Sequence, residues 1–241
     1  MGQDAPTPTK QPQQVRRMFG RIVRRYDLLN GLMSLGMDTR WRRLAATAAR
    51  PAGGLALDLG AGTGDLTLEL ASRGAAQVVG ADFSPEMLAV ARTKAASGAS
   101  ANVTWTLADA LRLPFPEETF DCVTNAFLLR NLANLREGLS EMARVLQPGG
   151  RLVCLDMTQP PPGPFGALYR LYFNRVMPPL AGMLSGDRHA YSYLPNSLHG
   201  FPDAPTLSGL ITDAGLVQVQ AQRLAGGTVA LHTARKPPFE A

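Results

Sequence analysis

The stretch LDLGAGTGDL, from Leu57 to Leu66, decides the fold. An apolar run leads into an aspartate, three glycines follow at every second position, and a polar helix start comes next. This pattern predicts a strand over residues 55–59, a glycine loop, and a helix over residues 66–72. Glycines in such a loop allow positive φ and let a ligand approach the backbone closely.

The chain on both sides of this helix supports an α/β sheet. Further strands are predicted over residues 77–83, 103–108, 120–127, 151–157, 216–224 and 228–235, and further helices over 84–96, 132–146 and 206–214. QPGG at residues 147–150 predicts a helix stop and a turn. Three residues, AGG, join the last two strands, which is too short for a parallel crossover, so this pair is predicted to be antiparallel. The predicted fold is a Rossmann-like, doubly wound, seven-stranded, mostly parallel sheet with an antiparallel final strand. N-terminal helices precede it, and a helical insertion follows the fifth strand.

Length and composition suit one main domain with an appendage. We expect a disordered tail over residues 1–12, a basic helical cap over 13–50, and the main domain over 51–241, with an insertion at 160–200 that covers the substrate. No signal peptide is visible, and the most apolar segment, residues 165–184, is interrupted by arginines and prolines. The two cysteines lie in apolar runs and are predicted to be core residues of a cytoplasmic protein, without a disulfide. The three histidines make no zinc-ligand spacing, so no metal site is predicted.

Positive charge gathers near the N-terminus. Residues 10–50 carry a balance of +8, against +5 for the whole chain. Within them, QQVRRMFGRIVRRYDLLN alternates apolar and arginine positions as a basic amphipathic helix does. Two interpretations stay open: docking on the protein's own core with a solvated arginine face, or attraction to anionic lipid headgroups. A nucleic-acid partner is not predicted, because no RNA-binding signature is present.

Acids beside the glycine loop suggest the ligand. Asp82 closes the second strand and Asp109 the third, and in such sheets ligands bind at the carboxyl ends of the strands. Asp82 can accept hydrogen bonds from both hydroxyls of a ribose, and Asp109 can accept one from an adenine amino group. These features predict a nucleoside derivative.

Charge narrows the choice of nucleoside. A dinucleotide site uses G-x-G-x-x-G to seat a pyrophosphate, whereas the spacing here is G-x-G-x-G. Asp58 and Asp65 flank these glycines, and carboxylates favour a cationic amino acid and sulfonium over a pyrophosphate. S-adenosylmethionine is therefore the predicted cofactor. Asp65 is also the acid that a helix N-terminus favours.

Distinctive motifs run along nearly the whole chain. LDLGAGTGDL, GADFSPEML and DALRLPFPEETFDCVT match the cofactor half of a known family, and its more specific features are YDLLNGLMSLGMDTRWRR, LRN, EMARVLQPGGRLVCLDM, YRLYFNRVMPPL, YSYLPNSL and GGTVALHTARK. On these residues the chain resembles the ubiquinone/menaquinone biosynthesis C-methyltransferases, a branch of the class I S-adenosylmethionine-dependent methyltransferases.

The resemblance implies methyl transfer to a ring carbon of a prenylated quinol, with demethylmenaquinol as the first choice in menaquinone biosynthesis. Alternatives are a benzoquinol of ubiquinone biosynthesis, another small-molecule methyl acceptor, or a non-catalytic cofactor-binding protein. Amino-nitrogen methyltransferases usually show Asn/Asp-Pro-Pro-Tyr after the fourth strand, where this chain has NAFLLRN. A prenylated substrate also implies contact with the inner face of the cytoplasmic membrane, and a homodimer stays an open option.

The resemblance also implies site residues. The cofactor positions are Asp58, Gly60, Gly62, Thr63, Gly64, Asp82, Asp109, Ala110 and Ala126. The candidate quinol-pocket residues, for which core packing is the alternative, are Tyr26, Asp27, Asn30, Asn131, Tyr191 and Tyr193.

Two residues are candidates for the chemistry. Arg130 would stabilise a developing phenolate, and its alternative is simple pairing with an acid. His232 would act as a base, and its alternative is an edge-strand histidine bonded to backbone.

The chain departs from the family pattern twice. Leu128 stands where the family usually has glycine, and this larger side chain is expected to narrow or reshape the pocket beside the cofactor. Asp156 stands where a glutamate is common.

Overall fold

The computed structural model describes residues 26–98, 102–160 and 200–238, together with positions 23, 163, 164, 166, 171, 175 and 198. The predicted tail, most of the predicted basic helix, most of the segment at residues 165–184, and both Tyr191 and Tyr193 lie outside the described residues.

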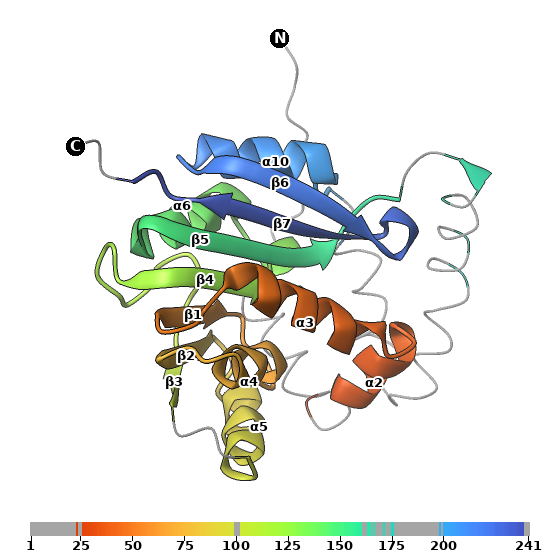
Figure 1. Ribbon diagram of the computed structural model, residues 1–241. Helices are drawn as coiled ribbons and strands as arrows, with labels where there is room; N and C mark the ends of the chain where they lie inside the picture. Colours follow the sequence, from red (N-terminus) through yellow and green to blue (C-terminus); the bar gives the residue numbers. More distant parts are fainter. Residues whose placement is uncertain are drawn as a thin grey trace.

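A seven-stranded sheet forms the centre of the protein (Figure 1). Its strands are β1 (Leu55–Leu59), β2 (Gln77–Asp82), β3 (Val103–Leu107), β4 (Phe120–Ala126), β5 (Leu146–Met157), β6 (Val217–Leu224) and β7 (Val229–Arg235). Their spatial order is β3-β2-β1-β4-β5-β7-β6. Strands β1 to β5 pair in parallel, and β7 runs antiparallel to both β5 and β6. The predicted fold class is confirmed.

Helices pack on both faces of this sheet. They are α2 (Tyr26–Met33), α3 (Met37–Ala49), α4 (Asp65–Ser72), α5 (Pro85–Ala96), α6 (Leu135–Val145) and α10 (Ala204–Asp213). Helices α3 and α4 share an apolar core with one face of the sheet, while α6 and α10 share a second core with the other face. Figure 1 shows α3 crossing the near face of the sheet, with α2 at its end. Both cysteines are buried, as predicted.

Some predicted boundaries were wrong. The helix predicted from residue 132 begins at Leu135, because a short 3₁₀ turn, η2 (Leu129–Asn131), precedes it and Asn134 caps it. QPGG lies inside β5 as an irregularity, since the pairing shifts between Phe120 and Cys122. The strand β3 ends at Leu107, two residues before Asp109.

The strand order fixes where a ligand can bind. Connections from β1 run toward β2 on one side, while β4 lies on its other side, so a topological switch point falls between β1 and β4. Crevices at the carboxyl ends of strands form at such points. Among the described residues, no helix is long and apolar enough to span a bilayer.

Candidate functional site

A cleft lies at this switch point. Its volume is about 820 Å³ when the solvent-filled mouth is included. Segments that follow β1, β2, β3 and β4 line it: Leu59, Gly60, Gly62, Asp82, Phe83, Met87, Ala108, Asp109, Ala110, Leu111, Ala126, Phe127, Leu128, Asn131, Leu132 and Ala133.

The glycine loop has the backbone that its sequence predicts. Gly60, Gly62 and Gly64 have φ angles of 70°, 56° and 91°, which side chains with a Cβ rarely adopt. The Gly60 amide donates to the carbonyl oxygen of Ala81 at 2.8 Å, which ties the loop to β2. A Cβ on Gly64 would lie 2.6 Å from the Trp105 ring, so glycine is needed there for packing as well as for conformation.

Asp82 is a buried acceptor at the end of β2. Its carboxylate accepts the Gly62 and Ser84 amides, each at 2.8 Å. A carboxylate offers about four acceptor positions, so these amides orient it and leave capacity for ligand hydroxyls. Burial raises the pKa of Asp82, and the backbone amides oppose this shift.

Asp58 lies deeper, in β1. The hydroxyls of Thr67 and Thr124 donate to its two oxygens at 2.6 and 3.0 Å. Burial raises the pKa of Asp58 to about 7, while these hydroxyls and the nearby Arg42 lower it. A cation placed beside Asp58 would favour its ionised form.

The adenine end of the cleft is mostly apolar. Asp109 is exposed at the cleft wall and accepts the Leu111 amide at 2.9 Å, beside the buried Ala110. Phe83 and Met87 also line the cleft, and sequence reasoning missed both. GADFSPEML contained a signal for Phe83, because this residue directly follows the strand-end acid, at the edge of the sheet where ligands bind.

A smaller cavity adjoins the cleft and shares Gly60, Gly62 and Ala126 with it. It is lined also by Asp58, Thr63, Asp65 and Arg42. Arg42, on α3, is a third residue that sequence reasoning missed. The sequence carried a signal for Arg42, because Asp38 precedes it by four residues, the spacing of an ion pair along a helix.

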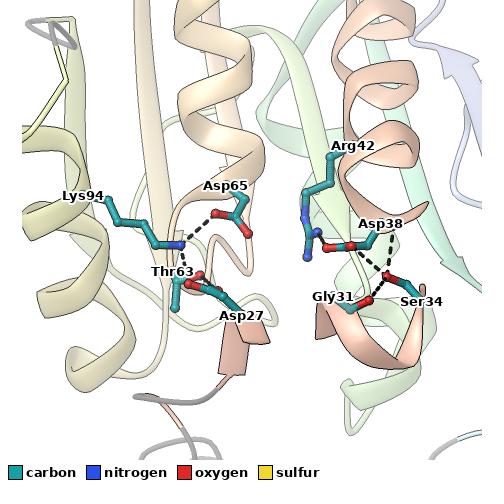
Figure 2. Close-up of polar contacts among 8 residues, drawn as sticks. All are labelled: Asp27, Gly31, Ser34, Asp38, Arg42, Thr63, Asp65 and Lys94. Carbon is teal, nitrogen blue, oxygen red and sulfur yellow. Dashed lines mark hydrogen bonds and ion pairs between the residues drawn. The ribbon is translucent and has the colours of Figure 1, made fainter. Parts of the chain in front are cut away.

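A polar cluster ties α2 to the glycine loop (Figure 2). The Thr63 hydroxyl donates to Asp27 at 2.6 Å, and Lys94 of α5 pairs with both Asp27 and Asp65, at 2.5 and 2.8 Å. Among the predicted quinol-pocket residues, Asp27 therefore contacts the cofactor loop, and neither Asp27 nor Asn30 lines the described cleft. Asn131 does line it.

Arg130 lies behind the cleft wall. It is buried in η2, and its Nη1 donates to Asp156 at 2.5 Å, at the end of β5. Its guanidinium also lies 5.4 Å from the centre of the Phe127 ring. Leu128, the departure from the family pattern, lines the cleft directly above Gly60, where a Cβ would approach its side chain to 2.9 Å.

His232 lies away from the cleft. It is 1% exposed on β7, and Nε2 is 3.0 Å from the carbonyl oxygen of Ala204 at the start of α10. Burial lowers the pKa of His232. β6, not β7, is the edge strand of the sheet, so the alternative interpretation of His232 as an edge-strand residue was wrong. The backbone hydrogen bond that this alternative included is present, to Ala204. This placement favours packing over proton transfer.

Comparison with known proteins agrees with this geometry. The ubiE/COQ5 methyltransferase family model matches residues 7–236. The chain belongs to this family. Demethylmenaquinone methyltransferase of Thermus thermophilus is 49% identical over 91% of this chain and 100% of its own length. That of Deinococcus radiodurans is 46% identical over 84% and 85%, and that of Mycolicibacterium gilvum is 45% identical over 95% and 97%.

Solved structures match the fold. The [4+2]-cyclase SpnF has a TM-score of 0.71, with 20% identity over 98% of each chain. A possible histamine N-methyltransferase from Thermotoga maritima has a TM-score of 0.64, with 18% identity over 92% of this chain and 99% of that one.

This ubiE/COQ5 family member is an S-adenosylmethionine-dependent methyltransferase. The described residues fit that cofactor: Asp82 has acceptor capacity for ribose hydroxyls, Phe83 and Met87 offer apolar surface for a purine, and Asp58 suits a cation. In the described part of the chain, no group of three or more His, Cys, Asp or Glu side chains is placed to hold a metal ion.

Proposed function

We propose that the protein methylates a ring carbon of demethylmenaquinol and so forms menaquinol. The observation that carries this proposal is identity of 41–49%, over 84–96% of the chain, to proteins named demethylmenaquinone methyltransferase. The apolar cleft wall at Phe127, Leu128 and Leu132 supports it, because a prenylated ring needs apolar surface beside the methyl donor.

The proposed chemistry requires alignment of the two reactants and the net loss of one proton. Bound S-adenosylmethionine supplies an electrophilic methyl group on a sulfonium. Deprotonating a quinol hydroxyl would make the ortho carbon nucleophilic. That carbon would take the methyl group as the carbon–sulfur bond breaks; the ring hydrogen would then leave as a proton and the oxygen would regain one, so that one proton is released in total. Alignment of the two reactants contributes roughly 7–11 kcal/mol.

We assign the proposed roles as follows. The glycine loop, Asp82 and Asp109 hold the cofactor, and Asn131 contacts the quinol. Arg130 stabilises the phenolate electrostatically, with Asp156 fixing its guanidinium. A catalytic role for His232 stays a prediction with little geometric support.

The test uses purified protein, labelled S-adenosylmethionine, and two short-tailed acceptors, a demethylmenaquinol and the matching benzoquinol. We expect label in the naphthoquinol ring carbon, and at least tenfold less in the benzoquinol. Transfer to the benzoquinol alone would refute the naphthoquinol assignment, and S-adenosylhomocysteine binding without transfer to either would refute the quinol assignment. Arg130→Lys should lose transfer and retain S-adenosylhomocysteine binding, while Arg136→Ala, at an exposed ion pair, serves as the matched control.

We further propose transient contact with an anionic membrane surface. Leu28 on α2 and Leu35 in the following turn expose 73% and 80% of their area, and Arg40 and Arg43 of α3 are exposed nearby in the chain. Exposed apolar side chains with flanking arginines suit a bilayer interface. Flotation with anionic vesicles at low salt should recover the protein, and Leu28→Ser with Leu35→Ser should reduce that recovery. Equal recovery with neutral vesicles would contradict the proposed attraction between the arginines and anionic lipid headgroups.

A further inference from the structure

A buried arginine, Arg42, lines the smaller cavity beside the glycine loop. Arg42 is 8% exposed and lines this cavity together with Asp58 and Thr63. The cavity measures about 300 Å³ with its open mouth included. Burying a guanidinium costs free energy unless it is paired and hydrogen-bonded, so its partners indicate what it does.

Arg42 is held firmly on one side. Its Nη1 forms an ion pair with Asp38, one helical turn earlier in α3. The Ser34 hydroxyl donates to the other oxygen of Asp38 at 2.7 Å, which fixes that carboxylate (Figure 2). The Phe127 ring lies 5.5 Å from the guanidinium carbon. These contacts preorganise the side chain.

The remaining donors of Arg42 are available to a ligand. A guanidinium has five N–H groups in a planar fork, and the described residues provide one hydrogen-bonding acceptor, Asp38. Since Arg42 lines the cavity, a ligand there can take the other donors. A fork of this kind matches a carboxylate in a bidentate arrangement.

The start of helix α4 also favours an anionic group in this cavity. It begins at Asp65, beside this cavity, with Gly64 as an N-cap that supplies no side-chain hydrogen bond. The start of a helix presents unsatisfied amides and favours negative charge. The Asp65 carboxylate pairs with Lys94, which reduces its repulsion of a second anion.

We propose that Arg42 binds the α-carboxylate of the methionine part of S-adenosylmethionine. The cofactor has two cationic groups and one anionic group. Asp58 and Asp82 suit cationic and hydroxyl groups, and Arg42 is the guanidinium that lines the smaller cavity. The adenosine part occupies the larger cleft, and the two spaces meet at Gly60, Gly62 and Ala126. This assignment is independent of the methyl acceptor.

The experiment separates the carboxylate from the rest of the ligand. Calorimetric titration compares S-adenosylhomocysteine with its decarboxylated analogue, which differs by that group alone. The unchanged protein should prefer the carboxylated ligand by about 10- to 100-fold, as expected for charge-assisted hydrogen bonds. In Arg42→Ala the preference should fall to about threefold or less, while affinity for the decarboxylated ligand stays within about threefold.

Controls keep the result interpretable. Arg136→Ala removes an arginine whose side chain is 68% exposed, in an ion pair with Asp213, and it should leave the preference unchanged. Arg42→Lys keeps the charge without the fork and should give an intermediate preference; it also replaces Arg42→Ala if that variant does not fold. Equal loss of affinity for both ligands, or an undiminished preference in Arg42→Ala and Arg42→Lys, would overturn the proposal.

Discussion

Replacing Arg130 with alanine tests the buried ion pair behind the cleft. Arg130 and Asp156 have side-chain exposures of 8% and 2%. Without the guanidinium, the Asp156 carboxylate keeps two backbone amides, those of Met157 at 2.7 Å and residue 130 at 3.3 Å. It remains buried, with its charge no longer balanced by that partner.

The magnitude follows from this geometry. Removing one partner of a buried pair costs about 3–5 kcal/mol, because an uncompensated charge stays buried. The two remaining amides place Arg130→Ala near the lower end, at about 3 kcal/mol. For a chain of this size that loss lowers Tm by about 6–12 °C.

Urea unfolding at pH 7 measures this loss. Arg136→Ala is the matched control, because its pair with Asp213 is exposed by 68% and 58% and should contribute less than about 1 kcal/mol. Arg130→Ala combined with Asp156→Ala should recover part of the stability, since no buried charge is left alone. A loss below about 1 kcal/mol for Arg130→Ala would refute the reasoning, and activity of this variant must be assayed well below its Tm.

Three further predictions concern the cleft. Because burial raises the pKa of Asp58 to about 7, the folded protein keeps a proton that the unfolded chain loses above about pH 4. The free energy of unfolding of the ligand-free protein should therefore fall between pH 4 and 7, by about 4 kcal/mol in total. In urea unfolding, the free energy of Asp58→Asn should depend less on pH over this range. Asp82→Asn removes an acceptor for ribose hydroxyls, so calorimetry should show S-adenosylhomocysteine binding about 10- to 100-fold more weakly; an unchanged Kd would contradict that role. Leu128→Gly removes the side chain above Gly60, so it should change KM for the quinol and cost about 1–3 kcal/mol in urea unfolding; an unchanged KM would place Leu128 outside the acceptor pocket.

The sequence was sufficient for the sheet and the glycine loop because their signals are local. Apolar runs, separated by helical segments or turns along the chain, marked all seven strands. The glycines at every second position predicted a loop that allows positive φ angles, and the loop adopts them. Three residues between the last two strands are too few for a parallel crossover, so an antiparallel pair was the arrangement that the sequence allowed. In the structure, η4 (Ala225–Gly227) forms this connection.

Other parts of the site depend on contacts between distant residues. Asp27 meets Thr63 across 36 positions, and Arg130 meets Asp156 across 26. No periodicity encodes such pairs, since they form only when α2 and the strand ends reach their places. His232 shows the same limit, because its burial follows from β6 lying outside β7. A sequence pattern can place a side chain on a face, but the covering element decides its chemistry.

Phe127 connects the two halves of the proposed mechanism. Its φ of 62° is rare for an aromatic residue. Its amide donates to Leu155 at 2.7 Å, and its carbonyl accepts from the side chain of Asn131 at 3.0 Å, so the surroundings fix this strained conformation. The Arg42 and Arg130 guanidinium carbons lie 5.5 and 5.4 Å from the same ring. On our assignments, Arg42 serves the methyl donor and Arg130 the acceptor. One rigid aromatic residue therefore relates the positions of both, and positioning is what a methyl transfer with a good leaving group most requires.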